Sequence, residues 1–111
     1  MIEIKVDSNK ELMASLTQEL KSRGIIRGAI VSIIGAVDKC CISNMPKEDA
    51  TKDILTEYEE PCEFSGSGEI RDGKPHIHCV LGREDNSTLS GHLHWAHVST
   101  WYVSCYIIPM D

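Results

Sequence analysis

The first part of the chain shows two periodic patterns of apolar residues, one typical of a strand and one typical of a helix. Residues 2–6 alternate apolar and charged side chains, which is the period-two pattern of a half-buried strand. Leucine then recurs every fourth residue from position 12 to position 20, as on the core-facing stripe of a helix. Ser8 and Glu11 form a Ser-x-x-Glu capping box, so we expect the helix to begin there and Gly24 to end it.

The rest of the chain favours strands. Residues 25–37 are almost continuously apolar, which is typical of a central strand that is covered on both faces. Residues 71–74 (Arg-Asp-Gly-Lys) have the chemistry of a tight hairpin turn. One helix followed by antiparallel strands predicts an α+β fold, with a mostly antiparallel sheet and one N-terminal helix packed on it. Further strands are expected at 39–43, 53–58, 75–81, 88–95 and 101–108.

Composition narrows the class of protein. A chain of 111 residues holds one core, so residues 1–111 are expected to form a single domain. Five cysteines, an odd number without a Cys-x-x-Cys pair, and a start without a signal peptide predict free buried thiols in the cytoplasm. No apolar run reaches the length of a membrane span, so no membrane partner is expected.

Charge bears on nucleic-acid binding. The chain has 11 Lys and Arg against 17 Asp and Glu, a net charge of −6. Binding to a phosphate backbone relies on Lys and Arg that displace counterions. The charge therefore disfavours direct contact with DNA.

The histidines lie close together along the chain, and four of the five fall on two consecutive predicted strands. Because side chains alternate across a strand, His76 and His78 share one face of the first strand. His92 and His94 share one face of the second, with Trp95 on its core side. Neighbouring antiparallel strands would bring these two pairs within a few ångströms of each other.

This arrangement points to a metal site. Imidazole is a common ligand for zinc, and three protein ligands leave the fourth position open for water or a substrate. The His76/His78 pair supplies two nitrogens, and either His92 or His94 supplies the third. We expect zinc, or another divalent transition metal, at this site.

Four segments in this order resemble the plant and prokaryote conserved (PPC) domain family, in its standalone prokaryotic type. They are a glycine-containing strand at 34–37 (Ile-Gly-Ala-Val), a Ser-x-x-Gly segment within 65–70, an Asp-Gly turn leading to His-x-His at 72–82, and Gly-His-Leu at 91–93. The likeness extends from about residue 25 to residue 108.

The resemblance implies a compact α+β domain that assembles as a homotrimer. Prokaryotic members can hold a metal through the His-x-His pair and the histidine of Gly-His-Leu, which here selects His92 over His94. The fold is also similar to that of acetolactate decarboxylase, whose zinc is held by His-x-His and a later histidine. Plant members add AT-hooks that bind DNA, and this chain has none.

Three functions are compatible with these features. The first is a metal-dependent protein that binds a small molecule or converts it, as a zinc-dependent lyase or hydrolase would. Its candidate residues are Glu69 as acid or base, His94 as proton shuttle and Arg27 as anion clamp. The second is a DNA-associated regulatory protein with a structural metal. The third is a scaffold trimer held together by aromatic side chains.

Overall fold

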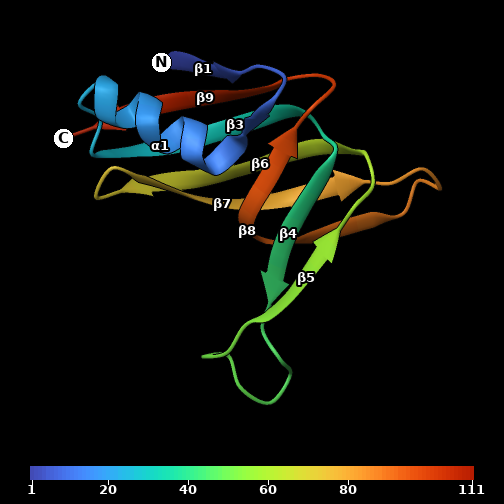
Figure 1. Cartoon of the computed structure of the whole chain (residues 1–111). Coiled ribbons are helices and arrows are strands. Elements are labelled where there is room, and N and C mark those ends of the chain that lie inside the picture. The colour runs from blue at the N-terminus through green and yellow to red at the C-terminus, as the bar shows by residue number, and fades with distance from the viewer.

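All 111 residues are described by the computed structural model, which contains one helix and a nine-stranded sheet (Figure 1). The predicted α+β fold, with one N-terminal helix on an antiparallel sheet, is confirmed. No helix is long and apolar enough to span a membrane. The helix is α1 (Leu12–Ser22), and the strands are β1 (Ile2–Val6), β2 (Lys10–Glu11), β3 (Arg27–Val37), β4 (Lys39–Asn44), β5 (Ile54–Tyr58), β6 (Cys62–Arg71), β7 (Lys74–Gly82), β8 (Thr88–Val98) and β9 (Val103–Met110).

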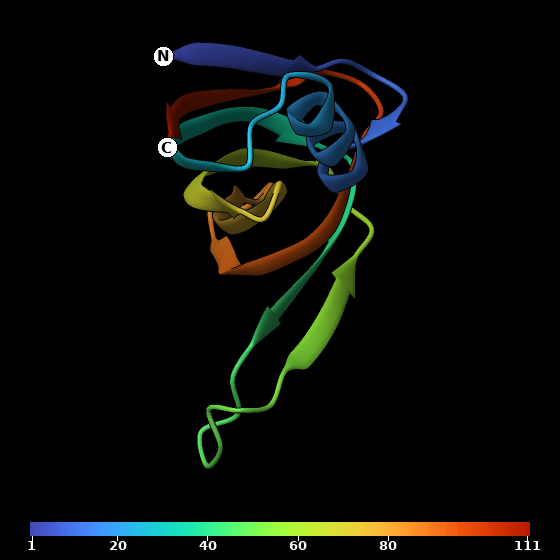
Figure 2. The ribbon, with the colours of Figure 1, turned by 90° about the vertical axis from the view of Figure 1, so that its left-hand side faces the viewer.

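The sheet follows the order β1-β9-β3-β6-β7-β8-β4-β5, and the short strand β2 pairs with β8. It curls around α1, which packs against β1, β7 and β8 (Figure 2). The predicted leucine stripe of α1 is completely buried at Leu12, Leu16 and Leu20. These leucines belong to a single core of 22 buried residues between the helix and the inner face of the sheet. All five cysteines are buried and unpaired.

The helix does not begin at the predicted capping box. Glu11 itself is the N-cap, and its carboxylate accepts hydrogen bonds of 2.8 Å from the backbone N–H groups of Met13 and Ala14. It also accepts one of 3.0 Å from Ala96 on β8. The prediction for Ser8 is wrong because the residues before the helix pair with β8 as β2. The predicted end is confirmed, since Gly24 follows the C-cap with a φ of +67°.

The long apolar strand β3 is covered on one face only, so the expectation of two covered faces is wrong. Ile34 is 57% exposed and Val31 is 45% exposed. A register shift just after Ile30 turns neighbouring residues outward, as in a β-bulge. The physical reason is that the one helix covers only the inner face and leaves the outer face open.

The hairpin of β4 and β5 projects from the rest of the sheet as an arm (Figures 1 and 2). Strand β5 pairs only with β4, and nearly all of its residues are exposed. The loop that joins the two strands walls a groove on the outer face of the sheet, beside β7 and β8.

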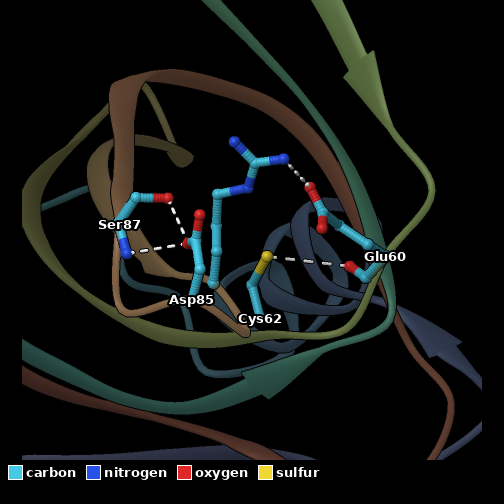
Figure 3. A network of polar contacts seen from close by, with 5 residues as sticks. Glu60, Cys62, Asp85 and Ser87 are labelled. Carbon is cyan, nitrogen blue, oxygen red and sulfur yellow. Dashed lines mark hydrogen bonds and ion pairs between the residues drawn. The ribbon is translucent and has the colours of Figure 1, made fainter.

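The turn between β7 and β8 is tied to the connection between β5 and β6. Arg83 and Glu60 form an ion pair of 3.0 Å. The Glu60 carbonyl accepts a hydrogen bond of 3.7 Å from the Cys62 thiol, and Asp85 accepts hydrogen bonds from Ser87 within the turn (Figure 3). Because β7 and β8 carry all the histidines, these contacts restrain the strands that build the candidate site.

The helix cap can be tested by comparing two alanine variants. Glu11→Ala is expected to lower the free energy of unfolding by about 1–3 kcal/mol, because three backbone N–H groups lose a charged acceptor. Ser8→Ala should change it by less than about 0.5 kcal/mol. Urea denaturation measures both, and equal effects of the two changes would contradict the assignment of the cap to Glu11.

Candidate metal centre

The side chains of strand β7 alternate between the inner and outer faces of the sheet. Ile77 and Cys79 are buried in the core, so His76 and His78 lie on the outer face. Burial also raises the pKa of the Cys79 thiol to about 11, so this neighbour stays protonated and apart from the histidines. The pairing of β7 with β8 places His78 directly opposite His92.

Three imidazoles converge on the outer face. The ring of His76 lies with its centroid 5.2 Å from that of His78 and 5.0 Å from that of His92. One nitrogen from each ring lies within 4.8 Å of the others. Zinc–nitrogen bonds of about 2.0–2.1 Å place tetrahedral ligand nitrogens about 3.3 Å apart. Small rotations of the rings, of which His76 and His78 are exposed and His92 is half-buried, can close this difference, so the three side chains fit a single metal ion.

His94 lies beside this group but outside it. Its ring centroid is 4.8 Å from that of His92, and its Nε2 shares a hydrogen bond of 2.8 Å with the Ser43 hydroxyl on β4. The β4–β8 pairing shifts register here and leaves His94 without a partner residue on β4. Ser43 is only 2% exposed, and nothing in its sequence context pointed to this contact, which depends on strand pairing alone.

The same register shift corrects the prediction for Trp95. Beyond it, Ala96 and Val98 are the residues of β8 that face the core. Trp95 therefore does not share the core side with Leu93, and instead packs against His97 with ring centroids 5.3 Å apart. The expectation that Trp95 faces the core is wrong because a β-bulge changes the alternation.

Electrostatics favour the neutral form of His92. Burial is the main cause that lowers the pKa of this imidazole, and the neighbouring His94, His76 and His78 lower it further. Asp53, in the loop of the arm, opposes this shift. A neutral imidazole is the form that binds a metal.

Glu69 is held next to the histidines by the register of β6 and β7, which places it opposite His76. Its Oε2 lies 3.0 Å from His76 Nδ1, and its Oε1 lies 2.9 Å from Arg71 Nε. The hydrogen bond with His76, followed by that with Arg71, lowers the pKa of the Glu69 carboxyl group. The carboxylate is therefore ionised and engaged at both oxygens.

Two hollows adjoin these residues. A groove of about 730 Å³ is lined by His78 and His92 together with Ser43, Asp53 and other residues, none of them Lys or Arg. A second hollow, of about 640 Å³, is lined by Arg27, Glu69 and Arg71 among others. Arg27 donates a hydrogen bond of 2.6 Å to the Asp111 carbonyl. The structure thus brings Glu69 and His94 into contact with the histidine group and places Arg27 further along the same face.

Two glycines on β6 set the position of the histidine strand. A Cβ atom at Gly68 would lie 2.1 Å from the carbonyl oxygen of His76, and one at Gly66 would lie 2.5 Å from that of His78. Both distances are too short for any side chain. The close approach of β7 to β6, and with it the place of the His76 and His78 backbone, depends on these glycines.

The sequence profile of the Plants and Prokaryotes Conserved (PCC) domain matches residues 1–109. The chain belongs to this family. The resemblance seen in the sequence is therefore confirmed, and the match includes the N-terminal strand and the helix. A search of curated proteins gave no match to this PCC domain.

Solved structures share the fold of this PCC domain. The plant- and prokaryote-conserved protein of Pyrococcus horikoshii superimposes with a TM-score of 0.86 at 22% identity, over 99% of this chain and 78% of the other. A metal-containing protein of Archaeoglobus fulgidus gives 0.81 at 29% identity, over 99% and 79%. A candidate DNA-binding protein of Bacteroides thetaiotaomicron gives 0.84 at 20% identity, over 98% and 78%.

The dependence on Gly68 can be measured. Gly68→Ala should lower the free energy of unfolding by about 1–3 kcal/mol, because β7 must move away from the new methyl group. It should also shift the NMR signals of the His76 and His78 imidazoles. Gly82→Ala is the matched control on β7, since its Cβ would meet its nearest atom at an ordinary 3.4 Å. Equal responses of the two variants would contradict the close-approach argument.

Proposed function

We propose that this PCC domain binds one divalent metal ion, zinc by preference, through His76, His78 and His92, and that a small molecule binds at the open metal position. The observation that carries the proposal is the convergence of three imidazole nitrogens within 4.8 Å on two paired strands. The metal-containing neighbour from Archaeoglobus fulgidus supports it. When bound by three neutral ligands, zinc supplies a strong Lewis acid and lowers the pKa of bound water.

The residues around the histidines suit a small polar ligand. The groove beside His78 and His92 offers hydroxyl groups and the Asp53 carboxylate, and Asn44 at its wall donates to the Ser90 carbonyl at 2.8 Å. His94, which shares a hydrogen bond with Ser43 at the edge of this groove, is the residue to which we assign the proton shuttle. Arg27 is the cation that we assign to an anionic end of a larger ligand. A lyase or hydrolase reaction would use these groups.

Self-association is the second part of the proposal. The PCC domain is expected to form a homotrimer, which the open outer face of the sheet supports. Ile34, Val80 and Ile108 lie on that face of β3, β7 and β9, each with more than 40% of its surface exposed. Burying such side chains between copies removes apolar surface from water.

The alternative function is that of a DNA-associated regulator in which the metal is structural. The neighbour from Bacteroides thetaiotaomicron is described as a candidate DNA-binding protein, and this is the observation in favour. The net charge of −6 counts against it. We therefore place the small-molecule function first.

Native mass spectrometry tests the metal and the assembly together. The wild-type protein is expected to show three chains with three zinc ions, one for each 12.4 kDa chain. The double change His76→Ala, His78→Ala and the single change His92→Ala should each abolish zinc binding, because two or fewer imidazoles remain. His97→Ala is the control, since this histidine packs against Trp95 instead. Full zinc occupancy in the double variant would sink the proposed site.

A gel-shift titration separates the two functions. The zinc-loaded wild-type protein is expected to leave duplex DNA unshifted even at low salt, because the chain carries a net charge of −6. A shift that weakens steeply as salt concentration rises would favour the DNA-associated function. Mass spectrometry on the same sample, showing that zinc is bound, makes the comparison valid for the loaded protein.

A further inference from the structure

Arg71, Glu69 and His76 form a chain of polar contacts. His76 is one of the three candidate metal ligands, with His78 and His92. Arg71 contacts one carboxylate oxygen of Glu69 at 2.9 Å, and the other carboxylate oxygen contacts His76 Nδ1 at 3.0 Å. All three residues lie on the outer face, because strands β6 and β7 pair Glu69 with His76. Arg71 and Glu69 are two positions apart on β6, and Glu69 is paired with His76 on β7. The arrangement of the three side chains therefore follows from the register of the sheet.

This contact decides which nitrogen of His76 is free. An ionised carboxylate only accepts hydrogen bonds, so the imidazole must donate its Nδ1–H to Glu69. A neutral imidazole with a proton on Nδ1 has its lone pair on Nε2. His76 therefore has Nε2 as its only nitrogen available to a metal.

The other two histidines have no such carboxylate. The residue paired with His78 on β6 is Ser67, which has no carboxylate. His92 pairs with His78 and with Ser43. Among the three candidate ligands, only His76 has a hydrogen bond to an acidic side chain.

We propose that Glu69, held by Arg71, is the positioning residue of the metal centre, which fixes His76 in the Nδ1–H form so that it binds the metal through Nε2. This inference rests on the proposed metal-binding function. Carboxylates that accept a hydrogen bond from a metal-bound histidine orient the ring and raise its basicity. The role differs from the acid or base expected from the sequence, because both oxygens of Glu69 are already engaged.

A positioning role and a structural role make different predictions. Glu69 is 38% exposed and Arg71 is 76% exposed, and ion pairs this open to solvent contribute little to stability. Loss of the Glu69 charge should therefore weaken metal binding while the metal-free protein stays as stable as before. A structural role would change the stability and leave the affinity of the folded protein unchanged.

The test measures zinc affinity by competition with a chromophoric chelator. Glu69→Gln is expected to weaken zinc binding about 10- to 100-fold, with Glu69→Asp recovering part of the loss. Arg71→Met should weaken it in the same direction but less. Glu63→Gln is the matched control, because Glu63 lies on the same face of β6, opposite Gly82, and the variant loses the same charge. Urea denaturation of each metal-free variant checks that stability is unchanged.

A second readout does not depend on metal. Nitrogen-15 NMR of the metal-free wild-type protein should show His76 protonated at Nδ1, and Glu69→Gln should reduce the population of that form. A wild-type His76 protonated at Nε2 overturns the inference. Normal zinc affinity in Glu69→Gln overturns it as well and leaves the proposed function standing. A wild-type protein with no zinc affinity overturns both proposals.

Discussion

The candidate centre depends on one strand pairing, that of β7 with β8 in the register that sets His78 opposite His92. Alternation places His76 on the same face as His78, and the diagonal across the two strands brings it to His92. A slip of one residue would turn the imidazoles of one strand toward the core and its apolar residues toward solvent. The buried residues of both strands, among them Ile77 and Leu93, therefore fix the register and the site together.

That register is supported from both sides of the histidine strand. On one side, Gly66 and Gly68 let the backbone of β7 approach β6 more closely than a side chain would allow. On the other side, the bulge in β8 interrupts the regular alternation at His94, between Leu93 and Trp95, and His94 contacts Ser43. Glycine weakens a strand interior, and a bulge interrupts its hydrogen bonds. Both features carry a cost in stability, and both shape the surface around the histidines.

The sequence predicted features that follow from local alternation and missed those that follow from long-range pairing. The leucine stripe, the end of the helix at Gly24 and the shared face of His76 and His78 are properties of short segments, and the structure has them. The start of the helix could not be predicted, because Glu11 caps it while β2 pairs with a strand more than 80 residues away. The orientation of Trp95 depends on a bulge, which no pattern within β8 reveals.

The same distinction explains which residues near the candidate metal centre could be predicted from the sequence. The sequence analysis named Glu69 only as a candidate acid or base, and its two partners become visible only when β6 is paired with β7. Ser43 and Asp53 carried no signal, since they come from the arm and approach β8 from the far end of the sheet. Sequence patterns found the candidate ligands that share a strand, whereas the residues that surround them come from other strands.

The charges around the three histidines also bear on whether a metal can bind there. Three imidazoles packed this closely repel one another when protonated, and both burial and the neighbouring histidines lower the pKa of His92. The lowered pKa of His92 favours its neutral form, which has a lone pair to offer a metal. Glu69 adds a negative charge on one side, with Arg71 balancing it from outside. Imidazole nitrogens beside a carboxylate are suited to a divalent transition metal, which is the ligand that we propose for this group.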